Sequence, residues 1–244
     1  MYEMDTLLTP PLTLLKQAWS LALSKSNRLT YMTLGAIPVV LSFGFSAITS
    51  YFITTSTDLE TVLTNFLNSA GVWGVVGIIA LVLIGIVFAV FIGTWYTALL
   101  YKIYQSTALN KPNSLSLHLH PSRLVILRLF ITSLKVGLLA TFGFLLLIIP
   151  GIIITVRYAF APLIAVTEEK VMNPLAESKQ LAQGRFWQLL RRSVIPFIFY
   201  SVPLSVFQAI HPILGSIWSL SSPIFGLYFY LVFVDFKRTA TPIA

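Results

Sequence analysis

The chain has 244 residues, of which 57% are hydrophobic and only 10% are charged, with a mean hydropathy of +0.86 and a formal net charge of +8. Because a soluble domain carries about a quarter charged residues, this composition excludes an ordinary soluble fold, and the excess apolar surface has to face lipid. The aromatic content of 14% excludes a disordered chain. With no cysteine in the sequence, disulfides, thiolate metal sites and cysteine nucleophiles are excluded as well.

Six stretches of the sequence are long and apolar enough for transmembrane helices, which need roughly 20 residues each. We predict an all-α, single-domain helical bundle over residues 1–244, with six transmembrane helices and short amphipathic helices at the interface. The predicted spans cover about residues 29–53, 72–101, 129–150, 152–166, 194–212 and 216–236. Pro150-Gly151 is expected to form a tight hairpin between the third and fourth spans, and Pro212 to Gly215 a second one, because Pro and Gly commonly end helices.

Two short helices are predicted outside the spans. Residues 12–23 place apolar side chains at helical spacing, which indicates a helix in the cytoplasmic interface, either packed on the bundle or sensing lipid headgroups. Asn173 and Pro174 are typical of a helix start, and Gly184 is typical of a helix end. Residues 173–184 are therefore expected to form a second cytoplasmic helix.

The loop between the second and third spans holds His118 and His120. Two histidines at this spacing share a face only in an extended segment, and no acidic residue or third histidine stands near them. We therefore predict no metal site there, and no cofactor for the chain.

The basic residues define an orientation. Fourteen of the sixteen Lys and Arg lie on the side of the membrane that also holds both termini, whereas the opposite loops carry only Asp58 and Glu60. By the positive-inside rule, both termini are predicted to be cytoplasmic. This distribution also explains the net positive charge without nucleic-acid binding.

Three short motifs lie between Leu145 and Leu190. One helix ends in Ile-Pro150-Gly151-Ile, the returning segment contains Ala161-Pro162, and the next helix contains Ser178-x-x-Leu181. This pattern resembles the YciC-like family of uncharacterised bacterial inner-membrane proteins and is more distantly similar to the membrane domain of some glycerophosphoryl diester phosphodiesterases. The resemblance implies a multi-pass protein of the bacterial cytoplasmic membrane, with Pro150, Gly151 and Pro162 in a helix-hairpin motif. It implies no reaction.

Two cations fall within the predicted spans. Lys135 is near enough to the cytoplasmic end for its ammonium group to reach the headgroups. Arg157 is predicted to lie roughly 10 Å inside the outer boundary, counting 1.5 Å per residue from the hairpin, and no acidic residue is expected at that depth. An arginine there needs carbonyls, hydroxyls, water or an anion. We expect Arg157 either to hold a lipid phosphate or another anion in a groove near Pro162, or to be satisfied by the protein itself.

Three further arginines lead from the second cytoplasmic helix into the fifth span: Arg185, Arg191 and Arg192. Arginines at this level can contact anionic lipid phosphates. The alternative is that they only anchor the topology.

Enzymatic activity is not expected. No Asp or Glu lies deep within a predicted span, and neither a phosphate-binding Gly-rich loop nor a hydrolase nucleophile elbow is present. We predict a lipid-associated or accessory protein of envelope maintenance, with membrane phospholipids as ligands and a homo-oligomer or membrane-protein partner as a further option. The alternative is a transporter or transporter subunit with an anion path near Arg157, because prolines within spans kink helices and kinked helices can line a cavity.

Overall fold

The computed structural model describes residues 8–54, 56–111 and 121–240. All regular secondary structure in these residues is helical, so the predicted all-α class is confirmed for them. The helices are α1 (Pro11–Ala22), α2 (Arg28–Thr54), α3 (Ser56–Ala108), α5 (Arg123–Leu146), α6 (Ile148–Arg157), α7 (Ala161–Thr167), α8 (Pro174–Ala182), α9 (Phe186–Ile210), α10 (Pro212–Ser219) and α11 (Ser222–Ala240).

Five segments of the described chain, rather than the six predicted, are long and apolar enough to cross a membrane. They are Ser69–Ala108, Arg123–Leu146, Ile148–Thr167, Phe186–Ile210 and Ile213–Ala240. The first predicted span forms α2, of which only Arg28–Leu41 is found as a shorter apolar helix. A sixth span therefore remains a prediction.

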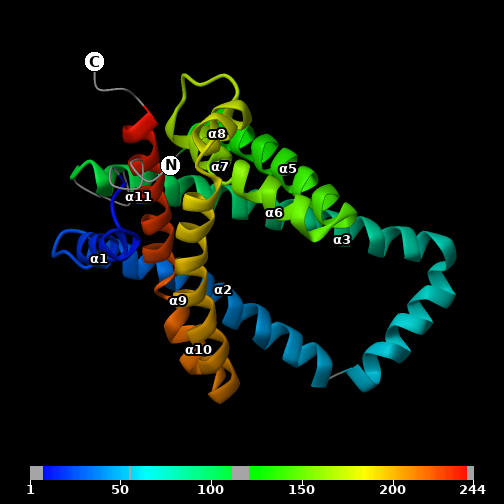
Figure 1. Cartoon of the computed structure of the whole chain (residues 1–244). Coiled ribbons are helices and arrows are strands. Elements are labelled where there is room, and N and C mark those ends of the chain that lie inside the picture. The colour runs from blue at the N-terminus through cyan, green and yellow to red at the C-terminus, as the bar shows by residue number, and fades with distance from the viewer. Residues whose placement is uncertain (1–7, 55, 112–120, 241–244) are drawn as a thin grey trace.

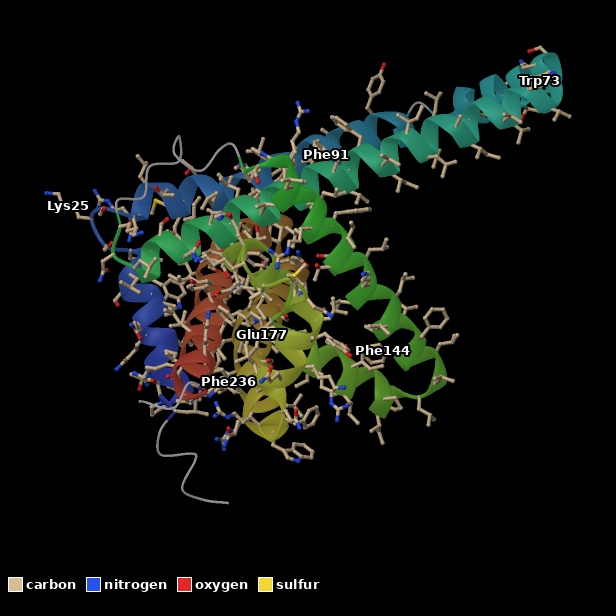
Figure 2. The ribbon with its side chains drawn as sticks, turned by 90° about the horizontal axis from the view of Figure 1, so that it is seen from above. Lys25, Trp73, Phe91, Phe144, Glu177 and Phe236 are labelled. Carbon is tan, nitrogen blue, oxygen red and sulfur yellow. The ribbon has the colours of Figure 1, made fainter. Side chains whose placement is uncertain are left out.

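The helices pack together at one end and diverge at the other. Residues from α1, α7, α8 and α11 share one buried core with the first turns of α2 and the last turns of α3. From this core, α2 and the long part of α3 spread apart (Figure 1), and we call the two together the first arm, with Trp73 at its far tip (Figure 2). The helices α5 and α6 form a second arm that ends near Phe144 (Figure 2). Side chains along the first arm are exposed and apolar, for example Leu81 and Phe88. Such a surface is stable only in an apolar environment.

The first arm bends at Gly71. This residue has φ +53° and ψ −142°, a backbone conformation that favours glycine, and it divides α3 into two helical parts. The part before Gly71 links the far end of α2 to the long part of α3 that returns to the core (Figure 1).

The two predicted hairpins exist, but their turns lie earlier in the chain. Leu147, with φ −164° and ψ 153°, separates α5 from α6, so the prediction that Pro150-Gly151 forms the turn is wrong. Pro150 instead lies in the first turn of α6, where a missing N–H costs no helical hydrogen bond. Gly151 permits close packing, since a Cβ there would lie 2.4 Å from Phe144. His211, not Pro212, makes the second turn.

The fourth predicted span is broken in its middle, and the sixth is broken near its start. Residues 158–160 separate α6 from α7. In a continuous helix the Tyr158 carbonyl would accept a hydrogen bond from residue 162, but Pro162 has no N–H and its ring crowds the Tyr158 carbonyl. Residues 220–221 separate α10 from α11, whose second residue is Pro223. The fifth span begins earlier than predicted, since α9 starts at Phe186.

The two short helices form where they are predicted. In α1, Ala18 and Ala22 are fully buried, and Trp19 packs edge-on against Phe225 of α11, with ring centroids 6.4 Å apart. This contact favours α1 as an anchor packed on the bundle. Asn173 caps α8 by accepting a hydrogen bond from the Ala176 N–H at 3.2 Å. The positions of α1 and α8 relative to a membrane remain predictions.

Gly35 of α2 allows the backbone of α2 to approach the α10–α11 junction. A Cβ at this position would lie 2.3 Å from the Leu220 carbonyl oxygen, which belongs to the backbone. Gly35→Ala should therefore lower the free energy of unfolding by about 1–3 kcal/mol through overpacking, seen as a lower thermal unfolding midpoint in detergent.

Gly44→Ala is the matched control, because it lies on the same helix and a Cβ added there would meet nothing within 4 Å. Its midpoint should stay level or rise, since Ala favours a helix over Gly by about 1 kcal/mol. Equal midpoints for the two variants would contradict the close approach at Gly35.

Candidate functional site

A groove beside Arg157 is the candidate site. It has a volume of about 530 Å³ and lies between the end of α6, the end of α8 and the start of α9. The residues that line it include Ile153, Arg157, Lys179, Gln183, Phe186 and Trp187. Two of its described lining residues are cations and none is acidic, so this Arg157 groove attracts anions.

The groove is built on the break between α6 and α7. This break leaves the Arg157 carbonyl and the Phe160 N–H without the partners that a continuous helix provides. The hydroxyl of Ser178 in α8 satisfies both: it donates to the Arg157 carbonyl at 2.9 Å and accepts from the Phe160 N–H at 3.2 Å. Ser178 is completely buried. Because it fixes α8 against the break, the next residue, Lys179, comes to line the same groove as Arg157.

The two cations of the groove are available for a ligand. Within the described residues, no hydrogen bond or ion pair engages the Arg157 guanidinium or the Lys179 ammonium, and both side chains are exposed. Ser178 bonds the backbone of Arg157 and leaves its guanidinium untouched. Trp187, which is 73% exposed, forms an apolar wall of the groove. The arrangement suits a ligand with a phosphate or carboxylate and an apolar part.

The depth of Arg157 in a membrane stays a prediction. Arg157 is the last residue of α6, which has ten residues and rises about 15 Å from the turn at Leu147. Arg157 lies beside α8 and the start of α9, which carry part of the predicted cytoplasmic charge. Pro162 is the second residue of α7 and does not line the groove.

Arg185 binds the end of α11 rather than the groove. Its guanidinium donates to the Thr239 hydroxyl at 2.6 Å, to the Thr239 carbonyl at 2.9 Å and to the Phe236 carbonyl at 3.3 Å. Carbonyls at a helix C-terminus lack helical donors and carry partial negative charge, which a cation stabilises. Arg185 is therefore a cap of α11.

Arg192 of α9 is buried in a hydrogen-bond network that joins α9 to α11 and to Thr9 at the N-terminal end of the described chain. Its guanidinium donates to the Asp235 carboxylate at 2.8 Å and to the Thr9 carbonyl at 2.5 Å, and the side chains of Arg192 and Asp235 are only 4% and 5% exposed. Asp235 also accepts from the N–H and hydroxyl of Thr9, at 2.9 and 3.0 Å, and from Arg238 at 3.1 Å. These internal partners remove Arg192 from the candidate anion ligands. Arg191 is exposed on α9 and does not line the Arg157 groove.

A charged cluster that sequence reasoning missed lies at the loop after α7. Arg128, in the second turn of α5, donates to the carbonyls of Glu168 and Glu169 at 3.1 and 3.0 Å and to that of Val171. One guanidinium thus binds three backbone carbonyls of the same loop. We call this loop and the cations that bind it the charged clamp.

Lysines from two other helices complete the charged clamp. Lys102 of α3 pairs with Glu169 at 2.8 Å, and Lys237 of α11 pairs with Glu168 at 2.5 Å. The hydrogen bond and positive charge of Lys102 lower the pKa of the Glu169 carboxyl. The Glu169 carboxylate therefore becomes protonated, and the pair is lost, at a more acidic pH than for an isolated glutamate. The ends of α3, α5 and α11 meet at one loop as a result.

The histidines do not form a metal site in the described structure. His118 and His120 lie outside the described residues, and no group of three or more His, Asp or Glu side chains suited to a metal is found among the residues described. His211 has a structural contact: its Nδ1 accepts from the Ile213 N–H at 3.2 Å and caps α10.

Comparisons with protein-family models, with curated proteins and with solved structures find no match to this chain. The site therefore has to be interpreted from its own residues.

The buried Arg192–Asp235 pair should be important for stability. Arg192→Met leaves the Asp235 carboxylate buried without its main counter-charge, which should cost about 3–5 kcal/mol of unfolding free energy. Thermal unfolding of the detergent-solubilised protein measures the loss.

Arg238→Met is the control, because it removes only the exposed partner of the same carboxylate and should cost less than about 1 kcal/mol. The double variant Arg192→Met/Asp235→Leu should recover part of the stability, since no unpaired charge remains. Equal losses from Arg192→Met and Arg238→Met would refute the role assigned to the buried pair.

Proposed function

We propose that the chain is a non-enzymatic, multi-pass protein of the bacterial cytoplasmic membrane that binds anionic phospholipid in the Arg157 groove, in an accessory role in envelope maintenance. The observation that carries this proposal is the pairing of Arg157 and Lys179, without described protein partners, in one groove beside an exposed tryptophan. Arginine binds phosphate oxygens through two parallel N–H groups, and lysine adds a second positive charge. The tryptophan ring suits the boundary between headgroups and acyl chains.

The membrane placement is supported by where the cations gather. Lys102, Arg128 and Lys237 come from three segments assigned to the cytoplasmic side, and all three meet at the charged clamp. Six spans with both termini inside remain part of the proposal. If α8 is cytoplasmic, as this placement proposes, the contact of Arg157 with Ser178 of α8 supports a groove near the inner interface, where anionic lipids create a negative surface potential.

Membership of the YciC-like family is also part of the proposal. The residues of the resembling motif act together in one structural unit: Gly151 lets α6 pack on α5, Pro162 lies in the first turn of α7 after the break, and Ser178 bridges that break. Such a unit accounts for a shared architecture and supplies no reaction.

The transporter alternative has weaker support. Pro196 and Pro203 do lie within α9, as kinked helices require. A transport path past Arg157 would need this residue inside the bundle, whereas its side chain is exposed beside α8 and α9. Lipid binding fits this open position better.

Removing either cation of the groove should weaken lipid binding. Arg157→Gln and Lys179→Gln are each expected to lower the affinity for phosphatidylglycerol about fivefold, because a basic residue near anionic lipid contributes about 1 kcal/mol. Native mass spectrometry of gently solubilised protein, titrated with this lipid, measures the change.

Lys25→Gln is the matched control, since Lys25 is an exposed cation in the turn between α1 and α2, away from the groove (Figure 2). It should bind phosphatidylglycerol like the parent protein. If Arg157→Gln and Lys179→Gln also keep the parent affinity, the groove does not bind phosphate.

Reporter fusions test the proposed orientation. A reporter joined after Ser69 should be exposed outside the cytoplasmic membrane, and one joined after Asn110 should be cytoplasmic, because the strongly apolar segment Ser69–Ala108 lies between them. Location of both reporters in one compartment would overturn the orientation.

A further inference from the structure

A second groove lies between α3 and α5. It has a volume of about 760 Å³, and most of its lining is apolar. The apolar side chains include Ile86, Val90 and Phe91 from α3 and Ile126, Phe130 and Leu134 from α5. We call it the α3–α5 groove. It shares no lining residue with the Arg157 groove.

The α3–α5 groove is a wedge between two diverging helices. Ala98 of α3 packs against Val125 and Leu129 of α5 in a small buried cluster, and the two helices separate from there, with α5 turning away near Phe91 (Figure 2). From Arg123 to Leu134 the groove follows α5 for about 16 Å. Packing within the chain does not fill this wedge, so acyl chains have to fill it in a bilayer.

One end of the wedge carries a single positive charge. Arg123 is the first residue of α5, its side chain is exposed, and within the described residues no hydrogen bond or ion pair engages its guanidinium. The other polar lining residue, Thr94, donates its hydroxyl hydrogen bond to the Val90 carbonyl of its own helix at 2.8 Å. The described lining thus combines one unneutralised cation with an apolar channel and contains no acid.

We propose that the α3–α5 groove binds one anionic phospholipid, with its phosphate on the Arg123 guanidinium and one acyl chain along α5 toward Leu134. Charge complementarity selects the headgroup, and the apolar walls hold the chain. This inference rests on the membrane placement in the proposed function and is independent of lipid binding in the Arg157 groove. The lipid would complete the contact between α3 and α5 that the protein leaves open.

Because the chain has no cysteine, single cysteines can report on the groove. Leu134→Cys places a fluorophore at its far end, and Leu81→Cys places one on an exposed part of α3 outside the groove. The labelled full chain is reconstituted in vesicles of phosphatidylcholine with a small fraction of either brominated phosphatidylglycerol or brominated phosphatidylcholine. Bromine on the acyl chain quenches a fluorophore only at close range.

Quenching at Leu134 should show about a fivefold preference for phosphatidylglycerol over phosphatidylcholine, and Arg123→Gln should remove that preference. Arg157→Gln should leave it unchanged, and quenching at Leu81 should be alike for both lipids. Leu127→Trp, which fills the groove, should reduce quenching at Leu134 by either lipid.

Equal quenching of the parent protein at Leu134 by the two lipids would overturn the proposal. So would a preference that survives Arg123→Gln. If Arg157→Gln removes the preference and Arg123→Gln does not, the lipid is bound in the Arg157 groove alone, which would leave the proposed function intact.

Discussion

The hydroxyl of Ser178 is the contact on which the candidate site depends. It accepts from one backbone N–H and donates to one backbone carbonyl at the break between α6 and α7, so a buried break costs no unsatisfied polar group. The same contact sets α8 beside α6. Without this contact, α8 would not be held against the break between α6 and α7. Lys179 of α8 would then not be held beside Arg157 in the same groove.

Charge is used in two different ways in the structure. Paired charges join segments of the protein to one another: Arg192 with Asp235 in the core, and the cations of the charged clamp with Glu168 and Glu169 nearer the surface. Exposed cations without described partners, Arg157, Lys179 and Arg123, lie instead at the edges of apolar grooves. This division distinguishes basic residues that stabilise the fold from those suited to lipid, although both kinds contribute equally to the positive-inside pattern.

The sequence predicts the helical class, both short helices and the cap at Asn173, because these depend on local spacing and on neighbouring residues. It also points to Arg157 as a site residue, since an arginine in an apolar stretch is unusual. It places the hairpin turn wrongly, because Leu147 has no turn signature, and it treats residues 152–166 as one helix although Pro162 ends the helical hydrogen bonding between α6 and α7. Lys179, Arg192 with Asp235 and the charged clamp come from contacts between distant segments. No local pattern encodes those contacts.

The contact between Thr9 and Asp235 spans 226 positions of the chain. Such a separation means that the compact end of the molecule cannot close while α11 is still missing, and until then the Arg192 guanidinium has neither its carboxylate nor a fixed Thr9 carbonyl to bind. A chain shortened before Asp235 would keep its apolar helices but lose the hydrogen bonds that join the N-terminal segment at Thr9 to α11. The N-terminal segment at Thr9 therefore gains these contacts only after the last helix of the chain has been made.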